Sequence, residues 1–130
     1  MDLSTQFVTY GGVILAVLGL IYAQVTYSNL KSMPRGNDTQ KKLGATIYDG
    51  AMSFIQQEYK YITIFVLVVG FLLFFYFGKE TALAYFGGAI LSMTCGWAGM
   101  TSACIANSRT AQAAASDGQG SALATAFKGG

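Results

Sequence analysis

Residues 61–78 read YITIFVLVVGFLLFFYFG, a run of eighteen positions with no ionisable side chain except tyrosine. A helix that crosses the roughly 30 Å hydrocarbon core of a bilayer needs about 20 predominantly apolar residues. Two further stretches without Asp, Glu, Lys or Arg, residues 3–30 and residues 81–108, are also long enough. The sequence therefore predicts an all-α membrane protein with three transmembrane helices.

The composition agrees with a lipid environment and excludes several classes of function. Of 130 residues, 53% are hydrophobic and only 11% are charged, whereas soluble domains carry about a quarter of their residues charged. The net charge of +2 is too small to indicate a nucleic-acid partner. The chain has no histidine, which excludes imidazole catalysis and histidine-ligated metals within this stretch.

The hydrophobic pattern predicts where the three helices begin and end. We expect spans at about 5–28, 45–78 and 81–112, with a cytoplasmic loop at 31–43 that contains the only proline. The chain opens with Asp2 rather than a basic segment, which favours a membrane span over a cleaved signal peptide. The second helix should begin with an amphipathic part outside the membrane. Its apolar residues recur at helical spacing: Leu43, Ile47, Ala51, Phe54 and Ile55.

The basic residues predict the orientation, because short cytoplasmic loops carry an excess of Lys and Arg. Five of the eight basic residues lie between the first and second spans, and only Lys79 lies between the second and third. We therefore expect the N-terminus outside, with residues 31–60 and the chain after 108 in the cytoplasm. Arg109 is expected to anchor the cytoplasmic end of the third span, where a cation also suits a helix C-terminal dipole.

Small side chains in the third span predict contacts with more helices than these three. In lipid, close helix packing depends on small residues, because no hydrophobic effect presses helices together. Two such faces are present at helical spacing: Gly88, Ser92 and Gly96; and Gly99, Ala103, Asn107 and Ala111. The end of the sequence, residues 116–130, has a DGQG turn and then begins another helical pattern. We therefore expect residues 1–130 to be a single N-terminal piece of a larger membrane domain, with the start of a fourth helix.

The acidic residues offer few candidates for chemistry. Glu58 lies near the membrane entry of the second span, where a carboxylate could serve an ion pathway. The simpler interpretation, which we favour, is a solvated interfacial residue or one paired with Lys60 or another helix's cation. Asp49 and Asp117 are expected to be solvated or to cap helices.

The cysteines and glycines of the third span also predict no site. Cys95 and Cys104 would lie on opposite sides of a helix and about 13 Å apart along it, too far for a disulfide. We interpret both as small apolar fillers. The segment 87–100 has glycines but no phosphate-loop pattern. The sequence therefore predicts no catalytic, cofactor-binding or metal-binding residue in this chain.

Two stretches resemble a known family. GAMSFIQQEYKYITIFVLVV at 50–69 is similar to the lead into the second helix of membrane-integral pyrophosphatases, with a Gly-Ala pair, a Phe and an E/Q-Y-K-x-I run. GGAILSMTCGWAGMTSACIANSRTAQAA at 87–114, followed by SALATAFKGG, is similar to that family's third helix and the entry to its fourth. The order and spacing agree across residues 50–130.

The resemblance implies a function for a larger protein. Members of the family are homodimers that hydrolyse pyrophosphate with Mg²⁺ on the cytoplasmic side, some with K⁺, and move H⁺ or Na⁺ across the membrane. Their reaction centre lies on later inner helices that this sequence does not contain. Residues 1–130 would then be outer helices one to three and the start of the fourth, inactive alone. A complete three-span accessory protein, without enzymatic activity, remains the alternative.

Overall fold

A computed structural model describes residues 3–130 as four helices. They are α1 (Leu3–Ser32), α2 (Asp38–Phe77), α3 (Lys79–Ser116) and α4 (Gln119–Gly129). The first three are long and apolar enough to cross a membrane. The predicted all-α membrane architecture with three spans and a further helix is therefore confirmed.

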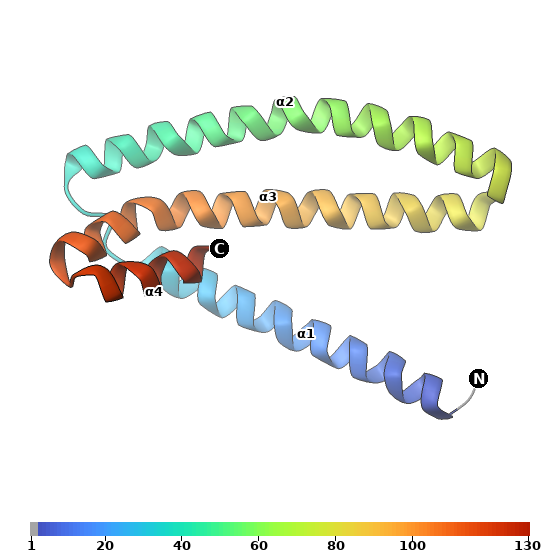
Figure 1. Cartoon of the computed structure of the whole chain (residues 1–130), viewed down its shortest axis with the longest axis horizontal. Coiled ribbons are helices and arrows are strands. Elements are labelled where there is room, and N and C mark those ends of the chain that lie inside the picture. The colour runs from blue at the N-terminus through green and yellow to red at the C-terminus, as the bar shows by residue number, and fades with distance from the viewer. Residues whose placement is uncertain (1–2) are drawn as a thin grey trace.

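Helices α2 and α3 form a long hairpin, and α1 and α4 contact it at one end. Figure 1 shows α2 and α3 side by side and antiparallel, joined by a tight turn at Gly78. Helix α4 folds back along the C-terminal part of α3, and α1 runs diagonally away from that same end. The contacts of α1 are with α3 and α4, so its N-terminal half has no neighbour among the described residues.

The connection between the first two helices is shorter than the predicted loop at 31–43. Helix α1 continues to Ser32 and α2 begins at Asp38, which leaves residues 33–37 between them. A capping box explains the early start of α2: Asn37 accepts from the Gln40 backbone, and the Gln40 side chain accepts from the Asn37 backbone. Apolar periodicity carries no information about these two polar residues, so it placed the start seven residues late.

Helices α2 and α3 approach closely where one of them has a glycine. A Cβ atom at Gly70 would lie 2.2 Å from the ring of Phe86, and one at Gly44 would lie 3.2 Å from the Cβ of Ser108. Between these points, the Tyr59 hydroxyl donates to the backbone carbonyl of Met93. Small residues and an interhelical hydrogen bond therefore hold the hairpin together, as is typical of helices in lipid.

The predicted amphipathic face of α2 does not face α3 as a whole. Ile55 is 6% exposed, but Leu43 and Phe54 are 61% and 58% exposed. The glycines of α2 determine which side approaches α3, because only they permit such short backbone distances. In a chain that contacts lipid or further helices, apolar residues on the opposite side are expected, so hydrophobicity alone did not identify the packed face.

The two small-residue faces of α3 have different surroundings. Gly96 faces the Tyr59 hydroxyl, 3.1 Å from where its Cβ would be, whereas Gly88 meets nothing within 4 Å. The second face is exposed throughout, at Gly99, Ala103, Asn107 and Ala111. Helix α4 packs beside that face, with Gly129 against Ala106.

The close contact at Gly70 gives a test of the hairpin. We expect Gly70→Leu to destabilise the protein by about 1–3 kcal/mol, because the new side chain must displace Phe86. Thermal unfolding followed by the reaction of buried Cys104 with a thiol dye, in a protein whose exposed Cys95 is changed to Ala, would measure this change. Gly87→Leu is the matched control, since a Cβ there meets nothing within 4 Å. Equal unfolding temperatures for the two variants would contradict the packing described.

Candidate functional site

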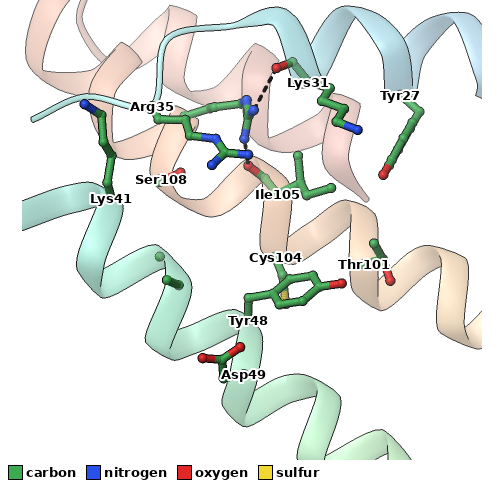
Figure 2. Close-up of a pocket in the computed structure, with 13 residues that line it drawn as sticks. Tyr27, Lys31, Arg35, Lys41, Tyr48, Asp49, Thr101, Cys104, Ile105 and Ser108 are labelled. Atoms are coloured by element: carbon green, nitrogen blue, oxygen red, sulfur yellow. Dashed lines mark hydrogen bonds between the residues drawn. The ribbon is translucent and has the colours of Figure 1, made fainter. Parts of the chain in front are cut away.

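Arg109 lies buried where α1, α3 and α4 meet. It is 3% exposed, and its guanidinium donates to two backbone carbonyls, those of Ile105 at 2.7 Å and Lys31 at 2.8 Å. The first bond is within α3, and the second crosses to the last turn of α1 (Figure 2). Arg109 therefore joins two helices that are far apart in the sequence.

The prediction that Arg109 meets the C-terminal dipole of its own helix is wrong. Helix α3 continues seven residues further, to Ser116, and Asp117 takes the C-cap position. Arg109 instead serves the C-terminus of α1. The last carbonyls of a helix have no partner within it, and a cation is favourable at that end. The expected helix-end chemistry is present, but the helix it serves is α1.

The other carbonyls at the end of α1 are also satisfied. The Ser32 hydroxyl donates to the Asn29 carbonyl at 2.7 Å, and the Met33 backbone donates to the Leu30 carbonyl at 3.2 Å. The side chain of Leu30 is fully buried. The buried Leu30 side chain and the hydrogen bond from Arg109 thus fix the C-terminal end of α1 against the rest of the chain.

A polar cavity lies beside this junction, between α1, α2 and α3. It has a volume of about 370 Å³. The α1 side and the connecting loop supply Tyr27, Lys31 and Arg35, as Figure 2 shows. The remaining lining comes from α2 and α3: Lys41, Gly44, Ala45, Tyr48, Asp49, Thr101, Cys104, Ile105, Ser108 and Arg109.

The charges around the cavity are strongly unbalanced. Four cations line it, and Asp49 is the one carboxylate among the described lining residues. Lys41 pairs with Asp38 at 3.1 Å, in an exposed i,i+3 contact. No salt bridge within residues 3–130 involves Arg35 or Arg109. The cavity is therefore a positively charged space between helices.

Two buried polar atoms at the cavity have no hydrogen-bond partner. They are Nε of Arg109 and Oγ1 of Thr101, on residues 3% and 6% exposed. Both residues belong to the cavity lining. An unsatisfied buried polar group costs about 1–3 kcal/mol, so this arrangement is suited to a ligand that accepts hydrogen bonds.

The acidic candidates occupy separate places. Glu58 is exposed on α2 outside the cavity, and no ion pair joins it to Lys60 in the described part of the chain. Asp117 caps α3 with its backbone N–H, 2.9 Å from the Ala113 carbonyl, and is exposed as predicted.

Across residues 3–130, no three side chains of the His, Cys, Asp and Glu types gather as metal ligands do. The described residues thus do not fit a magnesium site.

The cysteines are both free, and they differ in surroundings. Cys104 is buried at the cavity and acts as the small filler predicted, whereas Cys95 is exposed on α3. The absence of a bond between them agrees with their spacing.

Sequence reasoning missed the grouping of Lys31, Arg35 and Thr101 with Arg109. No local pattern shows it, since Arg109 and Lys31 are 78 residues apart in the chain. It also missed Tyr59 as an interhelical donor. A signal for both was available, because Tyr59 lies in the E/Q-Y-K-x-I run and Arg109 in the stretch 87–114, which both resemble the family.

Replacing Arg109 tests its role at the end of α1. We expect Arg109→Met to cost about 1–3 kcal/mol, because the Lys31 carbonyl loses its partner. Arg109→Lys should recover only part of this, since an ammonium lacks the planar fork that reaches two carbonyls. Hydrogen exchange should rise at residues 26–33. Lys79→Met removes a charge at the opposite end of α3 and should leave hydrogen exchange at residues 26–33 unchanged. A similar rise at residues 26–33 in this variant would refute the assignment.

Comparison with known proteins places this arrangement in a family. A family model described as inorganic H⁺ pyrophosphatase matches residues 17–130. The chain is 40% identical over 125 residues to a putative K⁺-stimulated pyrophosphate-energized sodium pump of Clostridium tetani, covering 96% of this chain and 18% of that protein.

Further relatives include a proton pump and a second sodium pump. The chain is 31% identical over 116 residues to a K⁺-insensitive pyrophosphate-energized proton pump of Methanosarcina mazei, covering 88% of this chain and 17% of that protein. It is also 31% identical over 118 residues to a K⁺-stimulated pyrophosphate-energized sodium pump of Thermotoga maritima, covering 90% and 16%. The chain thus spans less than a fifth of the length of these relatives. With the match over residues 17–130, this chain belongs to the membrane-integral inorganic pyrophosphatase family.

Proposed function

We propose that residues 1–130 are the N-terminal, outer-helix part of a pump that couples pyrophosphate hydrolysis to the movement of H⁺ or Na⁺ across a membrane. The family match over residues 17–130 carries this proposal. The relatives include both sodium and proton pumps, with and without stimulation by K⁺. The transported ion, H⁺ or Na⁺, and any K⁺ requirement are therefore properties of the whole protein.

The role of this segment in the pump is structural. Its carboxylates do not gather, so the Mg²⁺ ions that accompany pyrophosphate would be held by other parts of the protein. The exposed small face of α3 and the exposed apolar side chains of α1 favour close packing against further helices. We propose that the remaining helices of the parent chain cover these faces, and that the parent assembles as a homodimer.

The structural role predicts that the segment alone is inactive. Residues 1–130, purified by themselves, should release no phosphate from pyrophosphate in the presence of Mg²⁺, because no metal-ligand cluster is present in the described part. The control is the whole protein in the same detergent. Measurable turnover by the segment would overturn the role assigned to it. The reading frame of the gene decides the accessory-protein alternative, since a pump requires several hundred further codons.

The proposed topology places the α1–α2 connection in the cytoplasm and the α2–α3 turn outside. Its support is that five of the eight basic residues lie within residues 31–60. Single cysteines at Asp38 and Glu80, in a protein whose Cys95 and Cys104 are changed to Ala, would test it. In inside-out vesicles, a membrane-impermeant thiol reagent should label position 38 and spare position 80. The reverse labelling would show the opposite orientation.

A further inference from the structure

The guanidinium of Arg109 is a buried cation that lacks an anionic partner within the described chain. Its two acceptors are neutral carbonyls, and its Nε–H has no acceptor. A buried charge is strongly unfavourable unless it is paired and hydrogen-bonded. The two carbonyls compensate for only part of this cost, so an anion close to the buried guanidinium would be favourable.

The cavity offers more donors than a single arginine. Arg109 and Thr101 contribute the two unpartnered buried atoms, and Lys31 and Arg35 add mobile positive charges from the end of α1 and the loop. Figure 2 shows Lys31 and Arg35 on the α1 and loop side of this space, with Asp49 on its α2 side. Helices α1 and α2 make no close backbone contact within the described residues, so the cavity separates them.

The cavity lies at the level expected for lipid headgroups. Along the axis of α3, Arg109 is about 45 Å from Lys79, at 1.5 Å per residue. A bilayer measures about 40–45 Å with its headgroup regions. With the α2–α3 turn at one surface, the cavity is therefore level with the headgroups of the opposite leaflet. Basic pockets between helices at this depth suit phosphate-bearing headgroups.

We propose that this cavity binds a phosphate-type oxyanion. The oxyanion would lie beside the Arg109 guanidinium, the buried cation of the cavity lining. The Thr101 hydroxyl, Arg35 and Lys31 would meet its oxygens. A volume of about 370 Å³ admits a group much larger than water. One carboxylate from a neighbouring helix would leave most of these donors unmet, whereas a phosphate has several acceptor oxygens for them. The oxyanion would be either the headgroup of an anionic phospholipid or free phosphate.

The lipid arm of the test uses the whole protein that carries residues 1–130, purified in a mild detergent with added cardiolipin. Native mass spectrometry should show retained lipid. Arg35→Gln should weaken retention roughly five-fold, the effect of about 1 kcal/mol per basic residue near a headgroup. Arg35 is exposed on the loop and has no hydrogen bond to lose in the described chain, so this variant should fold. Lys42→Gln is the matched control, because it removes the same charge one residue beyond Lys41 but outside the cavity.

The phosphate arm uses the same protein after delipidation, in buffer without Mg²⁺. Inorganic phosphate should raise the unfolding temperature more than chloride of equal ionic strength does, and Arg35→Gln should reduce this difference while Lys42→Gln preserves it. Phosphate bound at any other site is common to all variants and cancels in the comparison.

The two arms identify the source of the oxyanion, and together they decide the proposal. Loss of retained lipid in Arg35→Gln alone identifies a headgroup, and a reduced phosphate effect alone identifies free phosphate. If neither ligand is retained, or if both cation variants behave alike, the cavity is not an oxyanion site. The Arg109 charge would then be met by carboxylates of neighbouring helices. The readouts are bound lipid and unfolding temperature, so they do not depend on hydrolysis.

Discussion

The hydrogen bond from the Arg109 guanidinium to the Lys31 carbonyl determines where α1 lies. Helices in lipid gain nothing from burying apolar surface against one another, because the surrounding tails are equally apolar. A 30-residue helix such as α1 thus needs specific contacts to have a defined position, and it makes few of them. The Arg109 bond and the buried Leu30 side chain, both at its C-terminal end, provide that position. In this arrangement the buried Nε–H of Arg109 has no hydrogen-bond partner among the described residues.

The hairpin of α2 and α3 also depends on specific contacts between helices, but these contacts are of a different kind. Glycines at Gly44 and Gly70 permit close approach, and Tyr59 donates across the interface to Met93. These contacts are distributed along most of the hairpin, whereas α1 is held at one end. The difference in attachment explains the arrangement in Figure 1, in which α2 and α3 run together and α1 diverges.

The sequence predicted the spans well and their contacts poorly, for physical reasons. Bilayer thickness imposes a minimum apolar length, so three such runs identified three helices. The start of α2 depends on the capping pair Asn37 and Gln40, which hydropathy does not record. The partner of Arg109 could not be predicted, because Lys31 offers a backbone carbonyl that every residue has.

The family resemblance was nonetheless informative about these contacts. Its two motifs contain Tyr59 and Arg109, side chains that donate hydrogen bonds between helices in the described part of the chain. A pattern recognised as a signature of the family thus coincides with the polar contacts that hold its helices together. Apolar periodicity made no prediction for Tyr59, and the distribution of charge assigned Arg109 only to the end of the third span.

Helix α2 is continuous from its capping box at Asn37 to Gly78 and contains no proline. Its 40 residues span about 60 Å, twice the hydrocarbon thickness. A helix without an internal break can tilt as one body. A tilt of about 5° around its midpoint moves each end by about 2–3 Å in opposite directions. Any displacement beside the basic cavity would therefore reach the turn at Gly78, on the far side of the membrane, without passing through a hinge.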